Sequence, residues 1–258
     1  MMTLNGGAVE YEDTGGTGKP LLLLHTLLAD RSVYDRVIPH LAGEWRVISP
    51  NFPGYGRSDG KIEGRIEAYG DFVAEFLDAL GLEKVDLVGN GFGGFVAQSV
   101  ALHHPGRIDR LMLVDTAPAF PDPAKIPLRG LQAKVLADGM SGVLDVAMLR
   151  MFPPAYIEGA PEVIAERRAA LAKADPTLFA NACGALVALD HVPHLGKITH
   201  RTLVLVGLED QTTPPALSRQ LAAGIPGATL VELPGVGHCP QVQSPDTFLA
   251  EIRAFLAS

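Results

Sequence analysis

The sequence predicts an α/β fold in which a mostly parallel sheet is flanked by helices and carries a helical lid. Short apolar runs that could form buried strands alternate with segments of helical periodicity over most of the chain. The alternation stops over one long internal stretch, where only helical patterns occur. The chain has 258 residues, of which 47% are hydrophobic and 19% are charged, so it can form one large domain with an inserted subdomain.

Six apolar runs have the length and the leucine-rich or β-branched composition of buried parallel strands. These runs are Leu21–His25, Val47–Pro50, Val85–Gly89, Leu111–Asp115, Leu203–Gly207 and Thr229–Leu233. The earlier segment Ala8–Glu12 is a candidate antiparallel edge strand that leads into the Gly-rich turn Thr14–Gly18. Helical patterns between the runs, which would cover both faces of the sheet, occur at Ile66–Leu80, Gly94–His103 and Pro245–Leu256.

The stretch from Pro118 to about Lys197 contains helical patterns separated by clusters of Pro and Gly. The expected helices are Arg129–Asp138, Gly142–Phe152, Pro161–Ala174 and Pro176–Asp190. We therefore assign residues 1–117 and 198–258 to the core and residues 118–197 to a helical lid, or cap, inserted between two core strands.

Composition and charge narrow the choice of partners. The formal net charge is −8, and no run of Lys and Arg offers the positive patch that nucleic acid or anionic lipid would need. The first residues lack a basic segment followed by an apolar one, so no secretory signal is expected. Cys183 and Cys239 match neither a disulfide framework nor a zinc motif. We expect a cytoplasmic protein, a monomer or a homodimer, that needs no metal or organic cofactor and acts on a small molecule.

The segment from Val88 to Gly94 carries the first chemical signal. Open parallel sheets bind ligands beyond the carboxyl ends of their strands, and here a strand runs into a helix through a Gly-flanked turn. The central residue of such a turn adopts a strained conformation, and a serine there would present its hydroxyl at the helix N-terminus. The central residue in this sequence is Gly91. The position of a catalytic nucleophile is therefore present without a nucleophilic side chain.

Two further strand ends supply an acid and a base. Asp210 follows the fifth apolar run, and a carboxylate there can orient a histidine by accepting its Nδ1–H. Glu209 and Asp115 are alternatives for the acid. His238 stands between Gly237 and Cys239 in the loop after the last strand, where it could act as the general base.

Backbone donors and several side chains complete the expected site. The N–H groups of Leu27 and Phe92 would form an oxyanion hole, which depends on no side chain. Asn90 and Thr26 border the nucleophile position and are expected to contact the substrate. Lid residues expected to line the substrate pocket are Met151, Phe152, Tyr156 and Phe179.

The remaining histidines and cysteine have plainer interpretations. His103 and His104 end a helix, where histidine suits the helix dipole, and are expected to be structural. His191 and His194 lie near the return of the lid to the core, where they could reach a ligand or remain in solvent. Cys239 beside the histidine is expected to fill space before a proline rather than to replace the nucleophile.

Over essentially its whole length, the chain resembles the α/β-hydrolase superfamily. The segments that carry the resemblance, in the order and at the strand ends that the superfamily requires, are His25–Leu27, Asn51–Ser58, Gly89–Gly94, Gly207–Asp210 and Gly237–Pro240. The resemblance implies an α/β-hydrolase fold with a mostly parallel eight-stranded sheet. The lid and the segment after it are most similar to 3-oxoadipate enol-lactonases. The elbow is also similar to that of meta-cleavage-product hydrolases, and both subgroups act on small carbonyl compounds.

Three residues depart from the superfamily pattern. Gly91 replaces the nucleophilic serine, Asn51 stands where an aspartate is usual, and Gln243 stands where a glutamate often follows the histidine loop. The first departure removes the attacking atom, whereas the other two are expected to be structural.

Three explanations of Gly91 remain open. The chain could be a knockout made to trap a substrate, or a binding protein that has lost catalysis. It could also be an enzyme whose His238 activates water or abstracts a proton directly, with the glycine leaving room for a water. We expect a small-molecule hydrolase that cleaves an ester, a lactone or enol-lactone, or a C–C bond of a β-dicarbonyl compound. The alternative is a non-catalytic protein that binds a small molecule.

Overall fold

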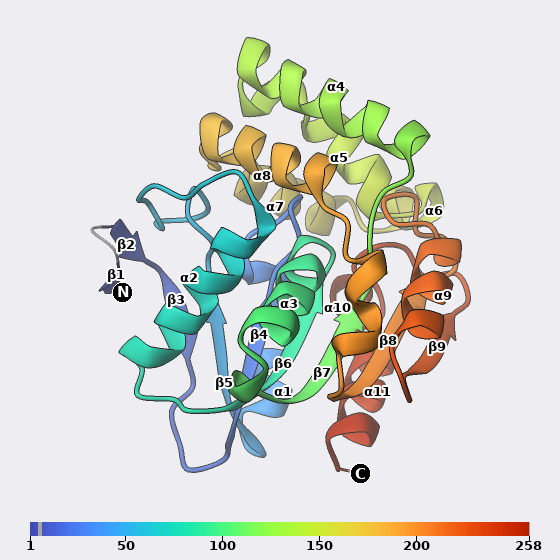
Figure 1. Cartoon of the computed structure of the whole chain (residues 1–258). Helices are drawn as coiled ribbons and strands as arrows, with labels where there is room; N and C mark the ends of the chain where they lie inside the picture. The colour runs from blue at the N-terminus through green and yellow to red at the C-terminus, as the bar shows by residue number, and fades with distance from the viewer. Residues whose placement is uncertain (5–6, 258) are drawn as a thin grey trace.

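The computed structural model describes residues 1–4 and 7–257, and its main sheet contains seven strands among these residues (Figure 1). Their order is β3-β5-β4-β6-β7-β8-β9, and every neighbouring pair is parallel except β3 with β5. The bounds are β3 Tyr11–Asp13, β4 Lys19–Leu24, β5 Trp45–Pro50, β6 Val85–Asn90, β7 Ile108–Val114, β8 Arg201–Gly207 and β9 Thr229–Leu233. The six apolar runs of the sequence each fall on one of the strands β4–β9, which confirms the predicted mostly parallel sheet.

The strand β4 shows why these runs are continuously apolar. All four leucines from Leu21 to Leu24 have no exposed surface, because helices cover both faces of a parallel sheet and leave no face for polar side chains. The two neighbours β5 and β6 are similarly buried over their carboxyl halves.

The expected count of eight strands in one sheet is wrong. Strands β1 (Met2–Leu4) and β2 (Gly7–Val9) pair with each other in a separate two-stranded sheet. The expected strand Ala8–Glu12 is split between β2 and β3, because the backbone between them bonds elsewhere. Ala8 O accepts from Asp59 N–H at 3.0 Å, and Glu10 N–H donates to Ser58 Oγ at 2.8 Å. A loop therefore takes the hydrogen bonds that would have extended the main sheet.

Helices flank the sheet, with α2 and α3 on the face toward the viewer in Figure 1. The long ones match the sequence patterns: α2 covers Ile66–Ala79, α3 covers Phe92–His103 and α11 covers Pro245–Ala257. The sequence patterns missed three shorter helices, α1 (Ile38–Leu41), α9 (Pro215–Gly224) and α10 (Pro240–Gln243). Single-turn helices carry too few residues to show a helical period, so α1 and α10 leave no such signal in the sequence.

A helical insertion separates β7 from β8 and gathers at the top of Figure 1, at one end of the sheet. Its helices are α4 Asp122–Asp138, α5 Leu144–Met151, α6 Pro154–Gly159, α7 Pro161–Leu171 and α8 Pro176–Ala188. The helix α4 begins at Asp122 rather than at the expected Arg129, and α6 was not expected. Pro123 and Pro154 suggested breaks, but proline is tolerated in the first turn of a helix, where its missing N–H is not needed. The helix α4 also includes Pro127, beyond its first turn.

The two ends of the insertion meet. Ala119 and Asp190 form an isolated antiparallel bridge, and His191 N–H donates to Pro118 O at 2.9 Å. The division into a core and a lid at residues 118–197 stays a prediction. Asn5, Gly6 and Ser258, which the predicted core segments include, lie outside the described residues.

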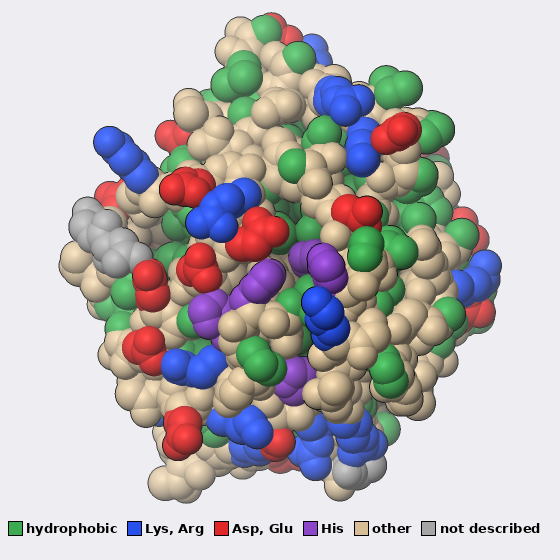
Figure 2. Space-filling view, viewed as in Figure 1, with side chains coloured by type: hydrophobic (Ala, Val, Ile, Leu, Met, Phe, Trp, Pro, Cys, Tyr) green, Lys and Arg blue, Asp and Glu red, His purple; other side chains and the backbone are tan. Residues whose placement is uncertain are grey.

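The surface in Figure 2 carries acidic and basic side chains interspersed rather than in blocks of one sign. Apolar side chains are exposed on the insertion, where Ile126, Leu136 and Leu149 are each more than half exposed. Within the residues that the structure describes, none of the helices combines the length and the apolar character needed to span a membrane.

Candidate active site

The turn between β6 and α3 has the geometry that the sequence predicts for a nucleophile elbow. Gly91 adopts φ 52° and ψ −114°, a region that residues with a side chain enter only under strain. Its N–H donates to Val114 O at 2.9 Å, and its carbonyl accepts from Thr116 Oγ1 at 3.0 Å. Two residues after it, Gly93 lies so close to β4 that a Cβ would overlap Leu24 O. The sharp bend is therefore fixed on both sides.

Asp210 and His238 form a buried pair beyond the ends of β8 and β9. His238 Nδ1 lies 2.9 Å from Asp210 Oδ2, and neither side chain has exposed surface. The carboxylate is also held by Thr213, whose hydroxyl donates to Oδ2 at 2.7 Å, and by the N–H groups of Thr212 and Thr213. These hydrogen bonds hold the carboxylate in place, so that it accepts the Nδ1–H of His238 and orients the imidazole.

The two alternative acids are placed differently. Glu209 is exposed, and its N–H donates to Val236 O. Asp115 is buried at the end of β7 with a positive φ of 45°, and its Oδ1 accepts from Gly207 N–H at 2.8 Å. Burial raises the pKa of Asp115 well above its usual range, and the charge of Asp210 raises it further. Asp115 thus joins the ends of β7 and β8 through this hydrogen bond.

A hydroxyl group faces the other nitrogen of the histidine. Thr26 Oγ1 lies 3.0 Å from His238 Nε2, and both residues are buried. Because Nδ1 carries the proton toward Asp210, Nε2 is the acceptor and the Thr26 hydroxyl donates. A Cβ built on Gly91 would overlap Thr26 Oγ1 and would lie 2.5 Å from His238 Nε2. The space expected to hold a water at Gly91 is therefore occupied by the Thr26 hydroxyl.

The two expected oxyanion donors lie on either side of this position. Phe92 is the first residue of α3, and Leu27 follows the end of β4. Over residues 1–4 and 7–257, the N–H of neither residue donates a hydrogen bond to the protein. Both residues line the same cavity as Gly91 and His238. Two unpaired backbone donors beside a base are suited to stabilising a developing negative charge.

The cavity at the site is small. Its volume is about 20 Å³, which is enough for roughly one water molecule. The residues that line it are Thr26, Leu27, Leu28, Gly91, Phe92, Phe95, Phe120, Leu128, Leu131, Arg150, Leu186, Thr212, Thr213 and His238. Five of these were expected from the sequence, and the remainder come mostly from the insertion and from the loop after Asp210.

Arg150, the last but one residue of α5, is the charged member of this lining that the sequence did not single out. Burial lowers the pKa of Arg150, although the charge of Asp210 acts in the opposite direction. Among the described residues, no carboxylate forms an ion pair with its guanidinium. The available signal in the sequence was a single cation near the end of a helical run whose other charged residue, Asp145, lies in its first turn.

Other residues expected to contact the substrate do not line this cavity. Asn90 turns away from the cavity, since its Nδ2 donates to His238 O at 2.9 Å and its Oδ1 accepts from Gln241 at 2.9 Å. Met151 accepts a hydrogen bond at its carbonyl from His238 N–H at 2.9 Å. The expected pocket residues that do not line the cavity are Asn90, Met151, Phe152, Tyr156 and Phe179. Several of them support the loop that carries the histidine.

Cys239 is a fully buried thiol beside His238. Burial raises the pKa of its thiol well above the usual range, and the charges of Asp115 and Asp210 raise it further. Gln243, the second departure near the histidine loop, accepts from Gly237 N–H at 2.8 Å and donates to Gly235 O at 2.7 Å. The glutamine therefore holds the loop in place.

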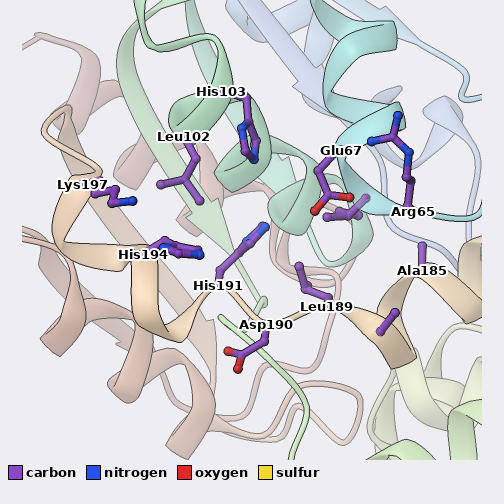
Figure 3. Close-up of a pocket in the computed structure, with 12 residues that line it drawn as sticks. Arg65, Glu67, Leu102, His103, Ala185, Leu189, Asp190, His191, His194 and Lys197 are labelled. Atoms are coloured by element: carbon purple, nitrogen blue, oxygen red, sulfur yellow. The ribbon is translucent and has the colours of Figure 1, made fainter.

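Another hollow, with a volume of about 460 Å³, lies elsewhere in the structure (Figure 3). It is lined from α2, α3 and the end of the insertion, and His103, His191 and His194 surround it together with Glu67 and Lys197. Burial lowers the pKa of His191 to about 4. No three His, Cys, Asp or Glu residues in the described part of the chain come together as a metal site. This hollow contains neither the acid–base pair nor the elbow, so the smaller cavity is the candidate active site.

Comparison with known proteins places the chain in a family. The sequence profile of the Alpha/beta hydrolase family matches residues 21–251. The chain is 28% identical to 3-oxoadipate enol-lactonase 2 of Acinetobacter baylyi, with 99% of this chain and 95% of that protein covered. It is 30% identical to 2-hydroxymuconate semialdehyde hydrolase of a Pseudomonas strain, with 94% of this chain and 88% of that protein covered.

A solved structure gives the same result at the level of the fold. The enol-lactonase from Burkholderia xenovorans superposes with a TM-score of 0.93 at 28% identity, covering 98% of both chains. The mostly parallel sheet, its flanking helices and the helical insertion all follow this architecture. The chain belongs to the α/β-hydrolase family.

Proposed function

We propose that this protein is a hydrolase that cleaves an ester, a lactone or a C–C bond next to a carbonyl group in a small molecule. The observation that carries the proposal is the buried pair of His238 and Asp210. The Nε2 atom of His238 faces the elbow at Gly91. Ligand binding alone does not require a histidine base oriented by a carboxylate, whereas general-base catalysis does. Here Asp210 orients His238 and is itself held by three hydrogen bonds from Thr212 and Thr213. The enol-lactonase and the semialdehyde hydrolase among its relatives are named for small carbonyl compounds, which supports the same substrate class.

The acid–base chemistry follows from the tautomer of His238, in which Nδ1 carries the proton and Nε2 is free to accept one. His238 accepts a proton at Nε2, and Asp210 stabilises the imidazolium that forms, which contributes about 10²–10⁴-fold to the rate. The N–H groups of Leu27 and Phe92 would bind the oxygen on which negative charge develops, and one such donor is worth roughly 3 kcal/mol. In this proposal the reaction uses protein groups and water alone.

The cavity indicates a compact substrate. A volume of about 20 Å³ is too small for a substrate molecule, so α4, α5 and α8 must move before a substrate can bind. We therefore propose that residues 118–197 act as a lid. Leu128, Leu131 and Arg150 line both this cavity and a groove of about 430 Å³ on the outside of the insertion. The groove is therefore the proposed entrance.

Turnover tests the proposed function. Aryl esters, small lactones and vinylogous diketones are offered to the protein, to His238→Ala and to Asp210→Asn. We expect at least one class to be hydrolysed, with a loss of about 10³-fold or more in His238→Ala and a smaller loss in Asp210→Asn. Turnover that is equal in all three proteins would contradict the proposal. Saturable binding without turnover would favour the alternative, a non-catalytic binding protein.

Arg150 adds a charge preference that the apolar lid sequence did not suggest. Its guanidinium lines the cavity without an ion-pair partner among the described residues, so a substrate carboxylate could bind there. We expect Arg150→Met to lower kcat/KM about tenfold or more for a carboxylate-bearing ester and to leave a neutral ester of equal length nearly unchanged. The matched control is Arg168→Met on α7, where the arginine pairs with Asp145 at the surface. An equal loss for both esters would rule out the charge preference.

A further inference from the structure

The hydrogen bond between Thr26 and His238 is not explained by a base that acts on water alone. Thr26 is separated from His238 by 212 positions in the sequence, yet its hydroxyl reaches Nε2 at 3.0 Å inside the candidate site. The following inference rests on the proposed function and adds the identity of the attacking group.

The direction of the hydrogen bond presents the hydroxyl proton to the base. Asp210 accepts from Nδ1 at 2.9 Å, so Nε2 has a lone pair and no proton. The Thr26 hydroxyl donates to this lone pair, and its oxygen lone pairs remain available for a bond to carbon. This is the arrangement of nucleophile, base and orienting acid that activates serine in other hydrolases.

The hydroxyl also stands where the missing side chain would be. A Cβ on Gly91 would overlap Thr26 Oγ1 and would come within 3.0 Å of Thr26 Cβ. A serine at position 91 and the observed Thr26 side chain therefore compete for one space. The glycine at the elbow is what allows the threonine from the loop after β4 to occupy the position in front of the base.

The surroundings of the hydroxyl fit an attack on a carbonyl group. Thr26, Gly91 and His238 line one cavity together with Leu27 and Phe92, whose N–H groups have no acceptor in the described chain. The Leu27 N–H belongs to the residue directly after the threonine, so nucleophile and donor are held by the same turn. The oxygen of a carbonyl attacked by Oγ1 would lie close to backbone donors.

We propose that Thr26 is the catalytic nucleophile, with His238 as its base and Asp210 orienting the base. The Oγ1–H proton passes to His238 Nε2 while the Oγ1 electron pair forms a bond to the carbonyl carbon. The tetrahedral intermediate collapses, the bond to the leaving group breaks, and the leaving group takes the proton from Nε2. Water, deprotonated by His238, then cleaves the acyl ester, and the proton on Nε2 returns to Oγ1.

A fluorophosphonate probe tests this without knowledge of the natural substrate. The nucleophilic oxygen forms a bond to phosphorus and fluoride leaves, so the labelled residue can be identified by peptide mass spectrometry. We expect the label at position 26 in the unaltered protein and in Thr26→Ser, and none at this position in Thr26→Val or His238→Ala. The matched control is Thr202→Val, which removes a buried threonine hydroxyl at the opposite end of the sheet and should label as the unaltered protein does. Absence of label from Thr26, or labelling that does not need His238, overturns the proposal.

Turnover kinetics separate this inference from the proposed function. With a hydrolysed ester, Thr26→Val should lose about 10³-fold or more in kcat with an unchanged fold, whereas Thr26→Ser should retain most activity. If Thr26→Val keeps a His238-dependent turnover, then the histidine activates water directly and only the nucleophile assignment fails. If no His238-dependent turnover occurs with any substrate, the proposed function fails, while the labelling result still decides the reactivity of Thr26.

Discussion

At the scale of single residues, two positions far apart in the sequence decide what this site can do. Gly91 supplies the bend and leaves the space, and Thr26 fills that space with a hydroxyl bonded to His238. Without the threonine hydroxyl, Nε2 would face the cavity with no hydrogen-bond donor from the described protein residues. The threonine satisfies the nitrogen, so the departure at one residue is matched by a side chain from another strand end.

Introducing serine at the elbow should therefore be costly unless the threonine is removed. Gly91→Ser places a side chain at φ 52° and against Thr26 Oγ1, and we expect a loss of about 1–3 kcal/mol in the free energy of unfolding from the strain alone. Adding Thr26→Ala removes the overlap with Thr26 Oγ1 and leaves the closest remaining contact of the new Cβ at His238 Nε2, so the double variant should be more stable than Gly91→Ser. Urea denaturation measures both.

The control for this comparison is Gly130→Ser, at an exposed helical position with open space around it, where little change is expected. The single variant Thr26→Ala gives the loss in unfolding free energy that removal of the Thr26 side chain causes. If the double variant were less stable than Gly91→Ser by this same amount, the side chains at positions 26 and 91 would not compete for the same space.

A buried histidine at the start of the same loop should make the fold sensitive to acid. Burial lowers the pKa of His25 to about 4, from an unfolded value of about 6.5. Its Nδ1–H donates to Thr26 O at 2.8 Å, and its Nε2 accepts from Phe52 N–H at 3.0 Å. Below pH 6.5 the unfolded chain binds a proton that the folded chain does not, so stability is full above pH 6.5 and falls until about pH 4.

Urea denaturation at several pH values measures this loss, which amounts to roughly 3 kcal/mol for a shift of this size. His25→Asn cannot become charged, so its stability should fall less steeply between pH 6.5 and pH 4, whatever its stability at neutral pH. His191 acts in the same direction and leaves a residual slope. His40→Asn, at an exposed position, is the control and should keep the original slope. Parallel curves for both variants would show that His25 is not the cause.

At the scale of secondary-structure elements, the insertion determines what reaches the site. Leu128 and Leu131 come from α4, Arg150 comes from α5 and Leu186 comes from α8, and together they close the cavity above the elbow. The helices α4 and α8 pack along each other, so the two sides of this closure are coupled. Substrate size should therefore be set by the side chains of the insertion rather than by the strand ends.

Shortening one of these side chains should change the substrate preference. Leu131→Ala removes apolar volume between the cavity and the outer groove, and we expect kcat/KM for a butyryl ester to rise roughly tenfold relative to an acetyl ester. Steady-state kinetics with the two esters give the ratio. Leu136→Ala, on the same helix but 60% exposed, should leave the ratio unchanged. Equal ratios in both variants would mean that α4 does not limit the substrate.

At the scale of the whole molecule, the insertion and the sheet share one hydrophobic core. Buried side chains of the insertion such as Leu128 and Phe179 belong to the same contiguous cluster as Leu22 and Val88 in the sheet. Elements that share a core lose their packing together, so the helices of the insertion should not unfold as a separate unit.

Two spectroscopic probes can test this cooperativity. Trp45, the single tryptophan, lies in β5 and reports on the sheet, whereas far-UV circular dichroism reports mainly on the helices. We expect both signals to change at the same urea concentration. A circular dichroism transition that begins well before the fluorescence change would show that the helical insertion unfolds first and forms a domain of its own.

The sequence by itself determined the order of strands and helices, the bend at Gly91 and the chain order of the elbow, Asp210 and His238. These features are encoded locally, in the period of apolar residues and in glycines that alone permit a sharp or crowded backbone. The same local rules gave wrong results where distant segments compete for hydrogen bonds. The split of Ala8–Glu12 into two strands depends on a loop some fifty residues later, which no local pattern contains.

Only the tertiary structure decided which side chains meet in the cavity. The pairing of Thr26 with His238, the entry of Arg150 from α5 and the turn of Asn90 away from the cavity depend on how remote elements pack together. A sequence pattern fixes the element on which a side chain lies and the face of that element to which it belongs. The direction of the side chain is fixed by its contacts, and for Thr26 and Asn90 the partner is His238, more than a hundred positions away.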